Sequence, residues 1–165
     1  MAPSEVLAVV AQVAVTLAGF AGIVVVFRPG GLDEWSAVER FRLRLLLVNS
    51  ALPLVLALFG LLLLTIEPPV PEIWRWCSGA AFLAQFVFGV MTQSMAKISG
   101  AAVVDPVSKL LYWSMAALGT AALLLQLVNV VWLGKFWPLF AGMFVHLLAA
   151  VLQFVRMILL PPHQR

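Results

Sequence analysis

The chain has 165 residues, of which 64% are hydrophobic and only 10% are charged, and its formal net charge is +3. Soluble domains carry about 25% charged residues, so this composition argues against a water-soluble fold. The basic residues lie in short clusters between long apolar stretches, which is typical of membrane topology signals and argues against a nucleic-acid partner. We therefore expect an integral membrane protein surrounded by lipid.

Five stretches free of Asp, Glu, Lys and Arg are long enough to cross a bilayer, which takes about 20 helical residues. They are residues 6–27, 45–66, 76–96, 110–134 and 136–155. Each is predicted to be an α-helix, because hydrocarbon offers no partner for backbone N–H and C=O groups. With their flanks, the expected helices cover about 6–27, 36–66, 74–96, 106–133 and 137–160, in an all-α bundle that forms one transmembrane domain, 1–165.

The connections between these stretches carry helix stop and start signals. Pro and Gly in 28–31 end the first helix, and the prolines of 68–71 end the second. Asp105 and Pro106 have the form of an N-cap and first residue of the fourth helix. The short connection 134–138 makes the fourth and fifth helices antiparallel neighbours.

The distribution of Lys and Arg orients the bundle. Eight of the ten basic residues fall on one side if the connections alternate: Arg28, Arg40, Arg42, Arg44, Lys97, Lys109, Arg156 and Arg165. Arg75 and Lys135 fall on the other. Cytoplasmic segments hold the excess, so we expect the N-terminus outside and the C-terminus in the cytoplasm, in the inner membrane of a bacterium. A four-helix alternative gives a poorer, less one-sided split of these charges.

The segment before the second helix has the form of a capping box, with Ser36 followed by Glu39 three residues later. The helix then carries Arg40, Arg42 and Arg44 beyond the membrane. This cytoplasmic basic cluster is expected to contact anionic lipid head groups. The alternative is a docking site for an acidic partner.

The uncharged stretches offer no catalytic arrangement. Their ionisable side chains are Cys77, Tyr112 and His146, and the intramembrane carboxylates typical of proton- or sodium-coupled carriers are missing. His146 could ligate a haem together with a methionine, but a hydrogen-bonded core histidine explains it without a further partner. We therefore predict a protein that is not an enzyme and holds no metal or cofactor.

Small residues repeat along the first helix. Ala11, Ala14, Ala18 and Ala21 follow a 3-4-3 spacing, which places them on one helix face. Small side chains let two helix backbones approach closely, so this seam is predicted to pack against another helix.

Two further helices carry mixed small and polar stripes. In the third helix the stripe is Ser78, Ala81, Gln85, Gly89, Thr92 and Ala96, and in the fifth it is Gly142, His146, Ala149, Gln153 and Arg156. Such stripes either hold helices together or line a water-filled path.

The second helix contains Pro53, which has no N–H to offer to the carbonyl of Asn49 and should therefore bend the helix. The side chains of Asn49 and Ser50 lie beside that carbonyl. This kink site could be only a bend, or it could hold water or an ion.

Three polar residues are expected at one depth near the middle of the bilayer. Thr16, Gln85 and His146 lie at or beside the centres of the first, third and fifth apolar stretches. A polar side chain that faces lipid at this depth is costly, so at least two should meet, with His146 at the centre of the cluster.

These features favour a non-enzymatic membrane protein. One hypothesis is a homo-oligomer that forms a passive pathway for an ion or small solute, since one chain of five helices is too small to enclose much of a pore. The alternative is a structural or accessory subunit of a larger membrane complex, held by its small-residue seams.

Overall fold

The computed structural model describes residues 1–27, 34–99 and 106–159. This part of the chain forms α1 (Pro3–Phe27), α2 (Ala37–Leu64), α3 (Ile73–Ser99), α4 (Pro106–Val128), the short π-helix η1 (Asn129–Leu133) and α5 (Phe136–Leu159), with no β-strand. Five helices, with α4 and η1 counted as one, are long and apolar enough to span a membrane. The predicted all-helical protein with five candidate spans is confirmed.

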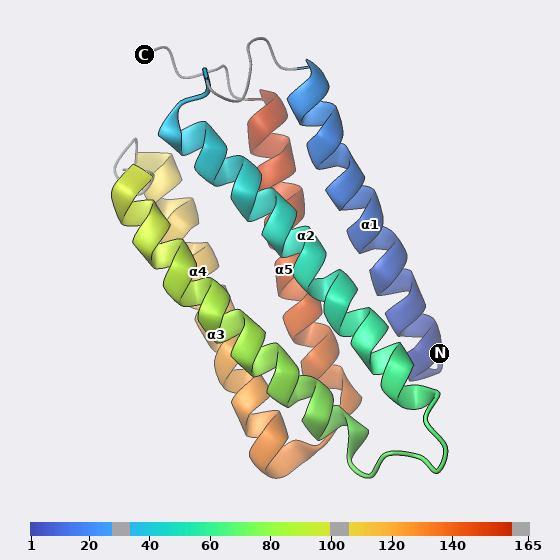
Figure 1. The fold of residues 1–165 in the computed structure, drawn as a ribbon. Helices are drawn as coiled ribbons and strands as arrows, with labels where there is room; N and C mark the ends of the chain where they lie inside the picture. Colours follow the sequence, from blue (N-terminus) through green and yellow to red (C-terminus); the bar gives the residue numbers. More distant parts are fainter. Residues whose placement is uncertain (28–33, 100–105, 160–165) are drawn as a thin grey trace.

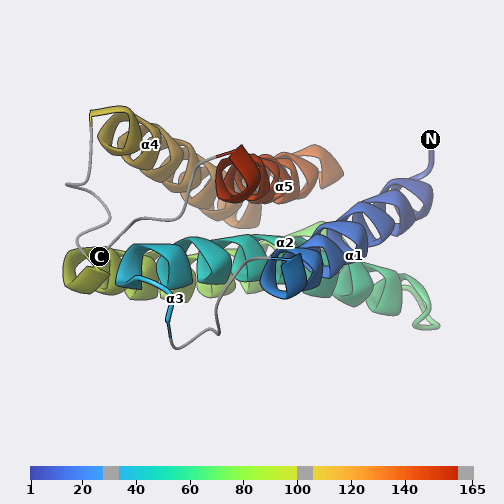
Figure 2. The ribbon, with the colours of Figure 1, turned by 90° about the horizontal axis from the view of Figure 1, so that it is seen from above.

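The helices form two layers. Seen from above in Figure 2, α1, α2 and α3 lie in one row, and α4 and α5 lie in a second row beside it. α5 contacts each of the other four helices, and α2 contacts α1, α3 and α5. In Figure 1, α1 begins and α5 ends at opposite ends of the bundle. We call the end where α2 and α4 begin the basic end, and the opposite end, which holds η1, the turn end.

The N-terminus of α2 is fixed by the predicted capping box. The Glu39 backbone N–H donates to Ser36 Oγ (3.2 Å), and the Ser36 backbone N–H donates to Glu39 Oε2 (2.8 Å). Two backbone donors that the first helical turn leaves unpaired are thereby satisfied. The capping-box prediction is confirmed, and α2 begins at Ala37.

α2 continues through Pro53, which is buried within it. The side chains beside this proline bond back to their own helix: Asn49 Nδ2 donates to the Leu45 carbonyl and Ser50 Oγ donates to the Leu46 carbonyl, both at 2.8 Å. Ser50 is therefore satisfied without a ligand, whereas Asn49 still has its side-chain oxygen to offer.

The buried face of α1 follows a heptad pattern and includes two of the four predicted seam alanines. Its buried residues are Leu7, Val10, Ala14, Leu17, Ala21 and Val24. Ala14 and Ala21 are essentially inaccessible, while Ala11 and Ala18 are partly buried at the edges of this face. The α1 face packs against α2 and α5, so the seam joins the two layers of the bundle.

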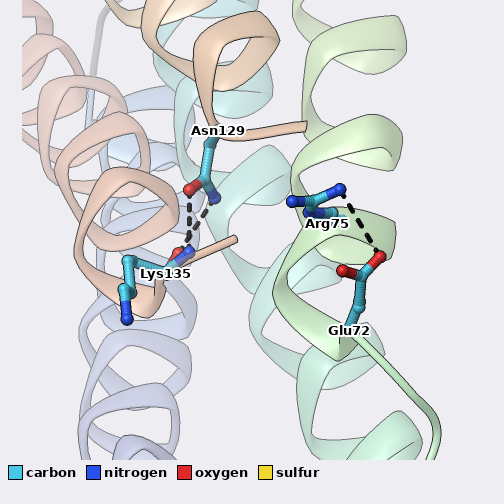
Figure 3. Close-up of polar contacts among 4 residues, drawn as sticks. All are labelled: Glu72, Arg75, Asn129 and Lys135. Carbon is cyan, nitrogen blue, oxygen red and sulfur yellow. Dashed lines mark hydrogen bonds and ion pairs between the residues drawn. The ribbon is translucent and has the colours of Figure 1, made fainter. Parts of the chain in front are cut away.

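The turn end is closed by a buried asparagine (Figure 3). Asn129 Nδ2 donates to Ser78 Oγ (2.7 Å) and to the Lys135 carbonyl (2.9 Å), and Asn129 Oδ1 accepts from the Lys135 backbone N–H (2.9 Å). Gly134, at φ +60°, donates its N–H to the Asn129 carbonyl (2.9 Å), and a Cβ there would lie 3.1 Å from Arg75 Nε. Arg75 also pairs with Glu72 (3.5 Å).

The expected helix over 106–133 is helical throughout, but its last turn, η1, is π-helical. A π-turn closes with a bond between residues five apart, as Gly134 and Asn129 form. The wider turn leaves the Asn129 side chain inside the bundle, where it holds both the α4–α5 connection and α3.

Ala14→Leu and Ala21→Leu should each lower the thermal unfolding temperature of the protein in detergent, since the added side chain has no room at a position that is 0% or 1% exposed. Overpacking of this kind costs ~1–3 kcal/mol. Val15→Leu, exposed on the same helix, is the control. Equal shifts for all three variants would contradict the assignment of the buried face.

Candidate functional site

A cavity of about 300 Å³ lies among α2, α3, α4 and α5 and is partly open to the outside of the bundle. Most of its wall is apolar, and its polar side chains gather toward two levels. Gly89 and Gly119 lie in the wall, and a Cβ at either position would meet no atom within 4 Å. The space beside both glycines is therefore open.

The level nearer the basic end carries two arginines. Arg42 comes from the first turns of α2 and is only 6% exposed, and Arg156 comes from the last turns of α5 and is partly buried. Gln153 and Tyr112 stand beside them in the wall, and Gln153 Oε1 has no hydrogen-bond partner. Within the described wall the charged side chains are both cationic.

The predicted basic cluster is therefore divided between different surroundings. Arg40 and Arg44 are exposed, as expected of residues that meet lipid head groups, and Arg44 donates to Met95 Sδ (3.5 Å). Arg42 instead turns inward into the cavity. Residues two apart on an α-helix lie on nearly opposite sides, so Arg42 points away from the face that carries Arg40 and Arg44.

The second polar level of the cavity, which lies farther from the basic end and is called the inner level, includes a contact between α2 and α5. His146 Nδ1 lies 2.8 Å from Asn49 Oδ1. Because Asn49 uses its amide nitrogen to donate to Leu45, its oxygen can only accept, and this assigns the proton to His146 Nδ1. The Nε2 atom of this cavity-lining ring is then left as a hydrogen-bond acceptor.

Gln85 from α3 is the unpaired polar group at this inner level. It is 6% exposed and lines the cavity, yet neither its side-chain oxygen nor its nitrogen has a hydrogen-bond partner. A buried amide without a partner costs ~1–3 kcal/mol. Such a group at the wall of a cavity is suited to bond to whatever enters.

The cavity ends toward the turn end at Gly142 and Gln126. A Cβ at Gly142 would lie 2.5 Å from Gln126 Nε2 and 3.2 Å from Gln85 Nε2, so a larger residue there would require the amide ends of these side chains to move. Gln126 is fully buried and donates from Nε2 to the Pro138 carbonyl (2.8 Å). Beyond it lies the buried Asn129, so the space between α4 and α5 is filled there.

The structure brings together two of the three residues expected near the bilayer midplane. Gln85 and His146 line the same cavity. Thr16 does not line this cavity: it is exposed on α1, and its hydroxyl donates to the Gln12 carbonyl of its own helix (2.9 Å). A threonine can satisfy its hydroxyl in this way and needs no partner from another helix.

Part of each polar stripe lines this same cavity. His146, Ala149, Gln153 and Arg156 of α5 face it, as do Gln85, Gly89 and Thr92 of α3. Gln126 and Asn129, which are buried beyond the cavity, were not among the predicted site residues. Their spacing was a usable signal, since two amides three residues apart in an apolar stretch share a helix face.

No family model, no curated protein and no solved structure matches the chain.

Gln85→Leu should leave the free energy of unfolding unchanged or raise it, since it removes two buried polar atoms that have no partner. Asn129→Leu is the contrasting variant, because Asn129 is equally buried but makes three hydrogen bonds. It should lose about 1–3 kcal/mol. Thermal unfolding of both variants in one detergent measures the difference. A Gln85→Leu protein as unstable as Asn129→Leu would show that Gln85 holds the fold together.

Proposed function

We propose that the protein is a non-enzymatic membrane protein that admits a small, partly apolar molecule into the cavity among α2, α3, α4 and α5. The observation that carries the proposal is the unpaired Gln85 amide, buried in the mostly apolar wall of the cavity that His146 also lines. Binding sites for small molecules have this composition, with apolar walls and a few polar groups that fix orientation. Packing alone would not favour a buried amide without a partner.

The side from which the molecule enters follows from the charge distribution. Toward the basic end lie the two cavity arginines, Arg40 and Arg44 near the start of α2, Lys97 near the end of α3 and Lys109 near the start of α4. Arg75, near the start of α3, and Lys135, between η1 and α5, lie at the turn end. Cytoplasmic segments hold the excess of Lys and Arg, which supports a cytoplasmic basic end and an N-terminus outside. We propose the inner membrane of a bacterium as the host membrane.

The cavity lies within one chain, so admission of a solute needs no second copy. A homo-oligomer that forms a passive pathway, and an accessory subunit of a larger complex, stay predictions. A pathway across the membrane would also require α4 and α5 to separate where Gln126 and Gly142 now fill the space.

The orientation is tested by two matched Lys→Cys variants at exposed positions, Lys97→Cys and Lys135→Cys. The native Cys77 is buried and serves as the unreactive background. In intact cells, a membrane-impermeant thiol reagent should label Lys135→Cys and spare Lys97→Cys, because only the turn end faces outward. Labelling in the reverse order would place the basic end outside.

Access to the cavity is tested by Gly119→Cys, with Leu124→Cys on the same helix as the control. Gly119 lines the cavity, whereas Leu124 is 55% exposed on the outer surface of the bundle and does not line it. A thiol reacts as its thiolate, which forms where water reaches it. In lipid nanodiscs, a small water-soluble maleimide should therefore react faster with Gly119→Cys. Equal rates for the two variants would refute a water-accessible cavity.

A further inference from the structure

We propose that the cavity binds a molecule with an anionic head, an apolar middle and a hydrogen-bonding group at its far end. The head, a carboxylate or phosphate, lies against Arg42 and Arg156, and the far end meets Gln85. This inference rests on the proposed function, because it names the class of molecule that the same cavity admits.

The charge of the wall favours an anion over a cation. Arg42 and Arg156 line the cavity, and no Asp or Glu of the described residues does. A guanidinium has five N–H donors in a planar fork, so an arginine that already holds one partner keeps donors for a carboxylate or phosphate. Arg42 is 6% exposed, and an attraction between opposite charges is stronger there than at a fully hydrated surface.

The two polar levels are separated by an apolar length of helix. Arg42 and Asn49 are seven residues apart on α2, or ~10 Å of helical rise, and His146 and Arg156 are ten residues apart on α5, or ~15 Å. Between these levels the wall includes Leu45, Met115 and Ala149. A bare inorganic anion would leave this apolar stretch uncovered, whereas an alkyl chain would cover it.

The residues at the inner level would form hydrogen bonds with a polar group on the ligand. Both side-chain polar atoms of Gln85 are buried without a partner. Asn49 already occupies His146 Nδ1, so the ring offers Nε2. A hydroxyl or carbonyl at the far end of the chain would supply the bond that Gln85 lacks, and a purely apolar end would leave it unpaired.

The test uses the full chain with Gly119→Cys in phosphatidylcholine nanodiscs and measures how far a bound probe slows maleimide labelling. The probes are decanoate and ω-hydroxydecanoate, with decanol lacking the charge and acetate lacking the chain. Decanoate should protect the introduced thiol, and ω-hydroxydecanoate should do so at a roughly threefold lower concentration because of one additional hydrogen bond. Decanol and acetate should not protect at the concentrations at which decanoate does.

Variants assign each end of the probe to its residues. Arg42→Gln and Arg156→Gln should each weaken protection by decanoate roughly tenfold, and Arg40→Gln, exposed and outside the cavity, should not change it. Should Arg42→Gln fail to fold, the partly buried Arg156 carries the same comparison. Gln85→Leu should abolish the advantage of ω-hydroxydecanoate while decanoate still protects.

Equal protection by decanol and decanoate, or unchanged protection in the Arg156→Gln variant, would overturn the anionic head. An ω-hydroxyl that gives no advantage would overturn the contact with Gln85. The proposed function fails differently, since the thiol introduced at Gly119 would then react no faster than the one at Leu124. Slower labelling in phosphatidylglycerol nanodiscs without any probe would identify lipid head groups as the source of the anion, and an unchanged rate would identify a soluble one.

Discussion

Hydrocarbon offers no hydrogen-bond partner, and the arrangement of this bundle follows from where its polar side chains find theirs. Thr16 and Ser50 bond to carbonyls of their own helices, and Asn129 bonds to α3 and to the α4–α5 connection. His146 bonds to Asn49 across two helices. Among the described residues, Gln85 is the buried amide whose oxygen and nitrogen both lack a partner, and it lies on the cavity wall. The same constraint therefore accounts for the packing and for the candidate site.

Local signals in the sequence predicted the elements well. The five spans follow from charge-free stretches of sufficient length, and Ser36 with Glu39 fixed the start of α2. These features depend on backbone hydrogen bonds and on neighbours within one helical turn, which the sequence displays directly. The π-turn at Asn129 was missed, because it depends on the connection to α5 and on Ser78 of another helix.

The sequence predicted the polar stripes that line the candidate site better than it predicted the full set of residues in the cavity wall. Periodicity placed His146, Gln153 and Arg156 on one face of α5, and they share the cavity with Gln85. Arg42 was predicted to belong to the basic cluster with Arg40 and Arg44 because of its charge alone. In the structure it lies on the buried side of α2. Tertiary packing decides which helix each face contacts. The depth of Thr16 in the membrane could not show that its hydroxyl bonds to a carbonyl of α1.

Closure of the bundle at Gln126, Gly142 and Asn129 has a thermodynamic consequence for any molecule in the cavity. A site that is blocked toward one face of the membrane equilibrates with the compartment or lipid leaflet on the other side. Its occupancy follows the chemical potential of the solute there and is insensitive to any gradient across the bilayer. A bound molecule must leave by the route through which it arrived, so uptake is saturable, and residence time is set by the contacts at the mouth and along the wall. Under the proposal made above, a bundle in which α4 and α5 stay in contact would let the bound molecule exchange with one side only, and binding alone would do no work against a gradient.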